Sequence, residues 1–126
     1  MRKIEVRSAL GAKSKAHYSA AVVHENLVYV SGQLPVDMDT GSLPEGKIDE
    51  QTRQALSNLS RILEASGSSL DKVLRTTAYI SDVSHWGDVD KVYAEVFNQH
   101  KPARTVVPVS NLHYGALIEI DAVAYI

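Results

Sequence analysis

The sequence predicts an α+β fold in which two helices lie on one face of a mixed β-sheet. Three observations support this. Two segments repeat apolar residues at helical spacing, five shorter segments are rich in β-branched and aromatic residues, and the segments follow the order β-β-α-β-α-β-β. No repeat, low-complexity tract or Gly- and Pro-rich linker divides the chain, so residues 1–126 are expected to form a single domain.

The N-terminal half is predicted to hold two strands and a helix. Residues 20–34 form the two strands, joined by a tight polar turn at residues 24–26, and the polar, Gly- and Pro-containing residues 37–46 form a loop. From residue 48 to 66 the apolar residues recur at steps of three and four, which is typical of an amphipathic helix. Gly67 provides the C-terminal stop.

The C-terminal half is predicted to hold a strand, a helix and two further strands. Residues 73–80 are β-branched and aromatic enough to form a strand, and Ser84 is a candidate N-cap for the second helix. Lys101-Pro102 ends this helix, because a residue before proline disfavours helical backbone. The last two strands are predicted at residues 104–109 and 116–125.

The last strand has apolar residues on both faces. Ile118, Ile120, Ala122 and Ala124 point one way, and the opposite face carries Leu117, Glu119, Asp121, Val123 and Tyr125. Two helices can cover only one face of the sheet, and another copy of the chain is the simplest cover for the other. The pattern therefore predicts a homo-oligomer without indicating the number of subunits.

Composition argues against several classes of partner. Fifteen acidic and thirteen basic residues give a net charge of −2, without the basic excess of a dedicated nucleic-acid binder. No apolar run approaches the length of a membrane-spanning helix, and residues 1–6 lack the apolar stretch of a signal peptide. There is no cysteine, which is consistent with a reducing compartment. We expect a cytoplasmic protein that binds neither membranes nor nucleic acid.

The common catalytic motifs are absent from the sequence. It contains no phosphate-binding Gly-rich motif and no spacing typical of a metal site, and its five histidines are far apart. Ser31-Gly32 ends an apolar strand, where small residues mark either a bulge or a close approach of ligand to backbone. Tyr18, Tyr29 and Tyr114 could line a pocket or fill the core.

Two charged residues are the strongest candidates for chemistry. Arg104 begins a strand, where its planar guanidinium could bind a carboxylate through two hydrogen bonds or form a surface salt bridge. Glu119 lies within an apolar strand, on the face expected to meet a partner. Partial burial there would raise its pKa and suit it to proton transfer, and a structural ion pair is the alternative.

Several blocks of sequence together resemble the reactive intermediate deaminase family, known as RidA or YjgF and also labelled endoribonuclease L-PSP. The similarity extends from about Tyr18 to Tyr125. The blocks are Ser31-Gly32-Gln33, Thr40-Gly41, residues 51–59, residues 62–71, Pro102-Ala103-Arg104-Thr105 and residues 118–124. The Pro-Ala-Arg-Thr and Ile-Glu-Ile-Asp-Ala blocks are specific in combination.

The resemblance implies a chorismate mutase-like fold of the bacillus type. It also implies a homotrimer whose sheets form a central barrel, with sites between subunits. Arg104 would bind the carboxylate of a 2-imino acid or 2-aminoacrylate, and Glu119 would orient or activate water. Tyr18, Ser31, Gly32 and the backbone around Arg104 and Thr105 would line the pocket. No cofactor or metal is implied, and the products would be a 2-keto acid and ammonia.

The chain departs from well-known members of this family near the expected pocket. Val106 replaces a common cysteine, Ala16-His17 replaces Gly-Pro, and residues 113–115 replace a Pro-Lys segment. Pro108 fits only an edge strand or a bulge. These changes concern substrate preference more than the reaction itself.

Three alternatives to a general imine deaminase remain open at this level. The protein could bind 2-keto acids without turnover, or act as a specialised deaminase in pyrimidine or aromatic amino-acid catabolism. The third alternative is the ribonuclease activity known in some relatives, against which the negative net charge argues.

Overall fold

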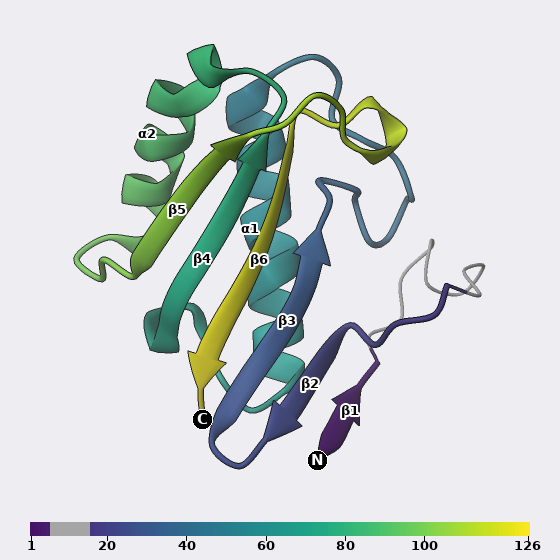
Figure 1. The fold of residues 1–126 in the computed structure, drawn as a ribbon, viewed down its shortest axis with the longest axis vertical. Coiled ribbons are helices and arrows are strands. Elements are labelled where there is room, and N and C mark those ends of the chain that lie inside the picture. Colours follow the sequence, from purple (N-terminus) through teal and green to yellow (C-terminus); the bar gives the residue numbers. More distant parts are fainter. Residues whose placement is uncertain (6–15) are drawn as a thin grey trace.

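The computed structural model describes residues 1–5 and 16–126, and it contains six strands, two α-helices and three short 3₁₀ turns within these ranges (Figure 1). The strands are β1 (Arg2–Ile4), β2 (Ala21–His24), β3 (Leu27–Gln33), β4 (Val73–Ile80), β5 (Ala103–Pro108) and β6 (Ile118–Tyr125). The helices are α1 (Ile48–Ala65) and α2 (Trp86–Phe97).

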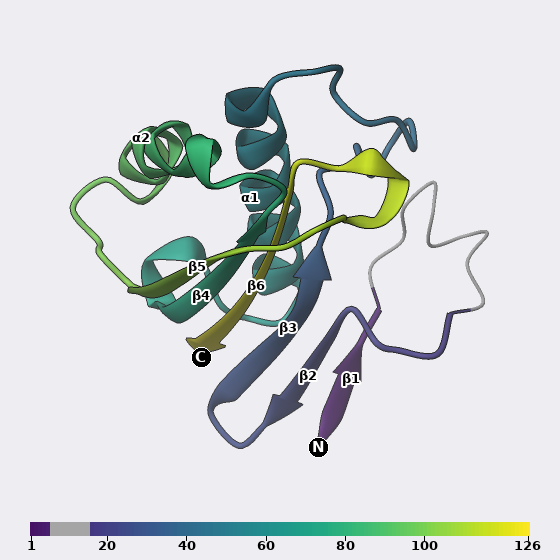
Figure 2. The same ribbon diagram turned by 45° about the horizontal axis from the view of Figure 1, so that its top comes forward.

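All six strands belong to one mixed sheet in the order β1-β2-β3-β6-β4-β5. The neighbours β4 and β5 are parallel, and every other pair is antiparallel. Both helices lie on the same face of this sheet (Figures 1 and 2). The prediction of an α+β fold with two helices on one face is confirmed.

Strand β1 is absent from the predicted order of elements. It has three residues, and only Ile4 is buried, so the sequence carries no alternation that would reveal a strand. The strand forms because the edge of β2 offers antiparallel partners to Arg2, Lys3 and Ile4. The order is therefore β-β-β-α-β-α-β-β.

The predicted limits of α2 are wrong at both ends. The Asp82 side chain accepts the Ser84 backbone N–H at 2.8 Å and caps a 3₁₀ turn, Val83–His85, which precedes the helix. Ser84 is therefore not the N-cap, because the neighbouring carboxylate takes the capping role. At the other end the helix stops at Phe97 rather than at Lys101-Pro102, and Asn98 follows with a φ of 55°.

The core lies between the sheet and the two helices. The apolar stripe of α1 contributes Leu56, Leu59 and Leu63, which are fully buried against β3 and β6. On β6 the predicted core residues Ile118, Ile120, Ala122 and Ala124 are all buried. The alternating apolar side chains of β6 thus face the helices, as the pattern predicts.

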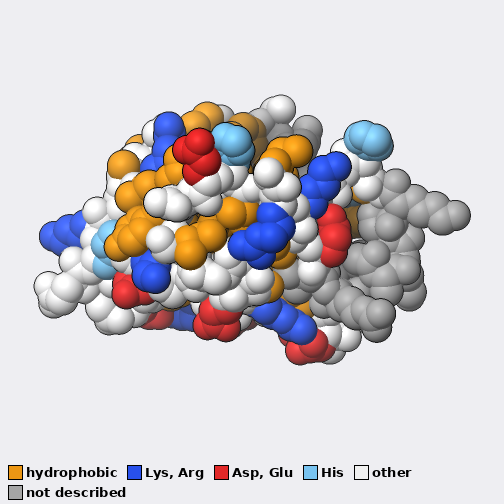
Figure 3. All heavy atoms as spheres, turned by 90° about the horizontal axis from the view of Figure 1, so that it is seen from below, with side chains coloured by type: hydrophobic (Ala, Val, Ile, Leu, Met, Phe, Trp, Pro, Cys, Tyr) orange, Lys and Arg blue, Asp and Glu red, His pale blue; other side chains and the backbone are white. Residues whose placement is uncertain are grey.

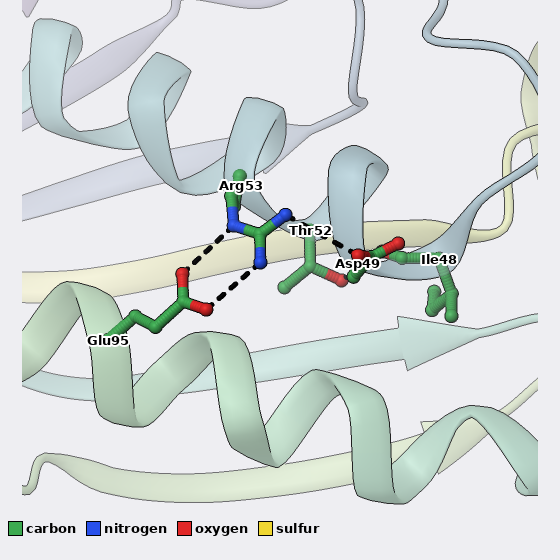
Figure 4. Close-up of polar contacts among 5 residues, drawn as sticks. All are labelled: Ile48, Asp49, Thr52, Arg53 and Glu95. Carbon is green, nitrogen blue, oxygen red and sulfur yellow. Dashed lines mark hydrogen bonds and ion pairs between the residues drawn. The ribbon is translucent and has the colours of Figure 1, made fainter.

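An exposed ion pair links the two helices. The Arg53 guanidinium donates from Nε and Nη2 to the two carboxylate oxygens of Glu95, each at 2.9 Å, and its Nη1 lies 3.4 Å from Asp49 Oδ2 (Figure 4). Below it, the Thr52 hydroxyl donates to the Ile48 carbonyl at 2.7 Å. Exposed pairs contribute little stability, so this contact mainly orients α2 relative to α1.

The sheet face that points away from the helices is only partly covered. Glu119, Asp121 and Val123 on β6 are half-buried, and Tyr29 and Tyr125 are exposed. Apolar side chains also gather at one end of the molecule, where β6 finishes, which Figure 3 views along the strands. This free face agrees with the predicted need for a second copy, and the homotrimer itself remains a prediction.

Among the described residues, neither helix is long and apolar enough to cross a membrane.

Candidate functional site

The Glu119 side chain lies on the face of β6 that points away from the helices. In the sheet register Glu119 is opposite Tyr79 of β4, and its neighbours Ile118 and Ile120 point into the core. The end of β3 and the beginning of β6 lie side by side in this region (Figure 1). The carboxylate is therefore held on a rigid strand beside the last residues of β3.

Gly32 leaves the space that the Glu119 carboxylate occupies. A Cβ atom on residue 32 would lie 2.7 Å from Glu119 Oε2 and 3.0 Å from its Cδ, both closer than such atoms normally approach. The bulge between Val30 and Gln33 interrupts the pairing of β3 with β6 at this point. The bulge that Ser31-Gly32 could mark is therefore present. The alternative, a close approach of ligand to this backbone, stays a prediction.

The pKa of Glu119 is raised above its ordinary value. Partial burial is the main cause, since it disfavours the charged form, and the nearby Asp121 carboxylate acts in the same direction. His113 opposes both effects weakly. A carboxylate with a raised pKa holds a proton more readily, which suits it to take a proton from water and return it.

Ser31 and Tyr18 belong to the same region. The Ser31 hydroxyl donates to the Ser19 carbonyl at 2.6 Å, and the Ser31 N–H donates to the Ala20 carbonyl at 3.0 Å. These two bonds fix the segment before β2 against the bulge, so Tyr18 stands next to it with 67% of its surface exposed. Gly32 and Glu119 are therefore in contact, Ser31 adjoins Gly32 in the chain, and Tyr18 precedes Ser19, to which Ser31 is bonded. A shared pocket that includes Tyr18 stays a prediction.

Arg104 lies on the opposite face of the sheet. It is opposite Thr76 of β4, which is fully buried on the helix side. Its Nη1 lies 2.9 Å from Asp90 Oδ1 on α2, and the centre of its guanidinium lies 4.9 Å from the centroid of the Tyr93 ring. The predicted alternative of a salt bridge is therefore present, on a side chain that is only 23% exposed.

Tyr93 forms the support beneath the Arg104 guanidinium. Its hydroxyl shares a 2.9 Å hydrogen bond with the buried Thr76 hydroxyl, which fixes the position of the ring. Burial raises the pKa of Tyr93 to about 12, so the phenol stays neutral. A cation over the face of such a ring is attracted by its quadrupole. The arginine is consequently held between an aromatic ring and a carboxylate.

A cavity of about 470 Å³ adjoins this arginine. It lies between the C-terminal part of α2 and the beginning of β5. Its lining is mixed, with aromatic, cationic and small residues: Asp90, Tyr93, Ala94, Phe97, Asn98, His100, Lys101, Pro102 and Arg104. The space beside the guanidinium is large enough to admit a small organic molecule.

Within one subunit Arg104 and Glu119 do not meet. Their partners on β4, Thr76 and Tyr79, are three residues apart, and successive side chains of a strand alternate between faces. The two charged groups therefore point to opposite sides of the sheet. Thr105 points to the Glu119 side, since it is opposite Thr77, but it lies on the edge strand and is exposed.

Comparison with known proteins identifies the family. Residues 8–126 match the family model described as Endoribonuclease L-PSP. The chain belongs to this family, also known as RidA or YjgF. It is 45% identical over 108 residues to a RutC family protein of Pyrococcus horikoshii, covering 86% of each chain.

Two further relatives bear on the site. The chain is 38% identical over 117 residues to the 2-iminobutanoate/2-iminopropanoate deaminase of Rattus norvegicus, covering 93% of this chain and 82% of the relative. It also resembles the crystal structure of Escherichia coli TdcF with bound serine, with a TM-score of 0.84 and 30% identity over 90% of this chain and 91% of the other. The RidA family thus contains proteins that are named as imine deaminases and others whose names give only the family.

Sequence reasoning missed two residues of this candidate site. Asp90 and Tyr93 lie three residues apart on α2, a spacing that places them on one side of the helix. That spacing could have paired them with each other, but nothing in the sequence shows that Arg104 of β5 packs between them. In the described part of the chain, no group of three or more His, Asp or Glu side chains gathers as a metal site would require.

Proposed function

We propose that this protein hydrolyses reactive 2-imino acids and their enamine tautomers, such as 2-iminopropionate and 2-aminoacrylate, to 2-keto acids and ammonia. The observation that carries the proposal is the Glu119 carboxylate, half-buried on a rigid strand against Gly32, with a raised pKa. The relatives named 2-iminobutanoate/2-iminopropanoate deaminase support the same reaction.

The Arg104 guanidinium would hold the substrate carboxylate. A planar fork of N–H donors matches the two oxygens of a carboxylate, and the Tyr93 ring keeps that fork in one orientation. The serine bound in the related TdcF structure is a small carboxylate of comparable size. Fixing the carboxylate positions the C=N carbon for attack, which lowers the entropic part of the barrier.

Glu119 would transfer the protons of the reaction. As the water oxygen bonds to C2, the C=N electrons move to nitrogen and the carboxylate accepts a proton from the water. The carboxyl group then returns this proton to the amino nitrogen of the carbinolamine. Breaking the C–N bond releases ammonia, and the Glu119 carboxylate accepts the hydroxyl proton as the carbonyl forms. This proton then passes to ammonia. Substrate and water are thereby converted into keto acid and ammonium.

The site would take its two charged groups from different copies of the chain. Arg104 lies on β5 and Glu119 on β6, two strand spacings apart or about 10 Å, and they point to opposite faces. A three- or four-carbon substrate cannot bridge that separation through the sheet. A neighbouring copy that covers the free face of one subunit could bring its Arg104 to Glu119, which fits the expected homotrimer with sites between subunits.

The direct test follows imine loss. An amino-acid oxidase with catalase generates 2-iminopropionate from alanine, and its disappearance is measured with and without the protein. We expect acceleration by the wild type and its loss in Arg104→Ala and in Glu119→Gln. Arg61→Ala, which removes another salt-bridged arginine, and Glu64→Gln, on an exposed face of α1, are the matched controls and should stay active.

The same experiment separates turnover from binding alone. If wild-type protein leaves the rate of imine loss unchanged but binds 2-oxobutanoate in a manner that requires Arg104, the deaminase proposal fails. The protein would then bind keto acids without turnover.

Mixing the two inactive variants tests the shared site. Arg104→Ala and Glu119→Gln subunits are unfolded together, refolded and assayed beside each variant treated alone. If each site uses Arg104 of one subunit and Glu119 of the next, random assembly restores about a quarter of the wild-type sites. If both residues act from one subunit, no mixed oligomer contains an intact site and the mixture stays inactive.

A further inference from the structure

We infer that Asp90 makes the Arg104 site discriminate between the imino acid substrate and the keto acid product. The inference rests on the proposed function, because it treats Arg104 as the group that binds the ligand carboxylate. The two ligands share this carboxylate and differ in charge at C2, where the protonated imine is cationic and the ketone is neutral. A fixed negative charge beside Arg104 therefore affects them differently.

The geometry places the Asp90 carboxylate next to any ligand carboxylate that Arg104 binds. Its Oδ1 lies 2.9 Å from Arg104 Nη1, and both residues line the cavity of about 470 Å³. A guanidinium offers donors on more than one edge, so a ligand can bind an edge other than the one that faces Asp90. Both carboxylates would then lie around the same small cation.

The position of this pair allows the Asp90 charge to act on a ligand. Arg104 is mostly buried against Tyr93, so its guanidinium has little freedom to turn away from α2. The Asp90 side chain is 64% exposed and Asp90 is not part of the buried core, so its replacement removes no core side chain. The Arg104 cation is therefore fixed in place, and the Asp90 charge can be removed by substitution.

The electrostatic consequence is a preference for a zwitterion. A bound keto acid adds a second negative charge next to Asp90 and is repelled by it. A bound imino acid adds the same negative charge together with a positive charge on the nitrogen bonded to C2. This positive charge offsets the repulsion. Asp90 would thereby weaken product binding while leaving substrate binding nearly unchanged, and this difference would promote product release.

Asp90→Asn tests this with a matched pair of ligands. We would measure the dissociation constants of 2-oxobutanoate and L-2-aminobutyrate by calorimetry, since they share a carbon skeleton and differ in the charge at C2. In Asp90→Asn the ratio of the keto acid constant to the amino acid constant should fall by about fivefold, the size expected for one partly screened charge. Asp88→Asn removes the same charge from an exposed position on α2 and should leave the ratio unchanged.

Other outcomes would overturn the inference. Equal tightening of both ligands would show that Asp90 only competes for Arg104, and equal weakening or loss of both would show that it only orients the arginine. The measurement does not depend on turnover. A shifted ratio in a protein without deaminase activity would uphold the discrimination and reject the proposed function, whereas an unshifted ratio in an active deaminase would reject the discrimination alone.

Discussion

The Glu119 carboxylate lies half-buried on β6, two residues from Asp121 and against the backbone of Gly32. Partial removal from water and a neighbouring negative charge both oppose its ionised form. A neutral side chain of the same shape would meet neither cost. Retaining a carboxylate there therefore lowers stability at neutral pH, and it provides a proton acceptor where the proposed reaction needs one.

Glu119→Gln should make the protein more stable at neutral pH while it lowers activity. A carboxyl group whose pKa is raised by folding favours the folded state when protonated, and this contribution is lost as the pH rises through the folded pKa. The glutamine variant avoids the loss, so its Tm should exceed that of wild type by about 1–4 °C at pH 7, a small effect because the group is partly exposed. Its kcat should fall about 100-fold.

Thermal unfolding at several pH values checks this prediction. The difference in Tm should shrink to zero as the pH falls below the ordinary pKa of glutamate, where both states are protonated in wild type. A difference in Tm that stays constant with pH would mean that the effect does not come from the Glu119 charge.

Gly32→Ala should remove activity with little loss of stability. The added Cβ would lie 2.7 Å from Glu119 Oε2, but the carboxylate is the end of a flexible side chain and can move away. The displaced group no longer holds water in position, so we expect kcat to fall at least about tenfold. Gly87→Ala on α2 is the control, because a Cβ there meets no described atom within 4 Å.

The Gly87 control should keep full activity and gain about 0.5–1 kcal/mol of stability, since alanine favours helix over glycine. Urea unfolding and the imine assay measure both effects. Full activity in Gly32→Ala would contradict the role given to the Glu119 position.

Helix α1 fixes the loop after β3 and the beginning of β6. The buried Gln51 side chain accepts the Leu117 N–H at 2.8 Å and donates to the Pro44 carbonyl at 3.1 Å. About two turns on, Asn58 donates to the carbonyls of Leu34 and Val36 at 3.1 and 2.7 Å. These amides satisfy backbone groups of irregular segments, and they hold the strand residues that precede Glu119.

Gln51→Ala should cost about 2–3 kcal/mol of unfolding free energy. The change leaves the partly buried Leu117 N–H and Pro44 carbonyl without this partner, and losing one member of a hydrogen bond costs more than losing both. Gln54→Ala is the control on the same helix, because Gln54 bonds only the Asn58 side chain at 2.9 Å and should cost below about 1 kcal/mol. Equal losses in urea unfolding would show that Gln51 contributes no more than a partly buried amide.

At the scale of the whole molecule, the two helices cover one face of the sheet, and the other face is only partly covered by the residues that the structure describes. The helices bury the core face of β6, and the other face presents Val123 and Tyr125 beside Glu119 and Asp121. Apolar area of this kind favours association with another surface. The proposed site needs the same association, because one subunit directs Arg104 and Glu119 to opposite sides.

Val123→Asp should dissociate the oligomer and abolish activity together. Val123 lies on the free face, opposite Tyr29 and Arg75, and a carboxylate there would have to be removed from water on assembly. Size-exclusion chromatography with light scattering should show a folded monomer, and imine hydrolysis should fall at least about tenfold. Ala65→Asp places the same charge on an exposed residue of α1 and should leave both unchanged.

A Val123→Asp variant that stays oligomeric would place the interface elsewhere. A monomer that keeps its activity would contradict the site shared between subunits.

The sequence by itself determined the local elements and which faces are apolar. The helix at residues 48–65 and the core face of β6 follow from periodicity, because burial on one side forces a repeat of 3.6 or 2 residues. Strand β4 follows from its β-branched and aromatic composition. The proline at residue 108 indicated an edge strand or a bulge, and in the structure it ends β5 at the edge of the sheet.

Only the tertiary structure decided what the charged residues contact. β1 forms because β2 leaves an edge to pair with, and Gly32 is needed because Glu119 crosses over it from a strand almost ninety residues later. The contact of Arg104 with Asp90 and Tyr93, and its separation from Glu119, depend on the order and register of the strands. Periodicity records which side of an element is buried, whereas strand order sets which side chains from distant segments meet.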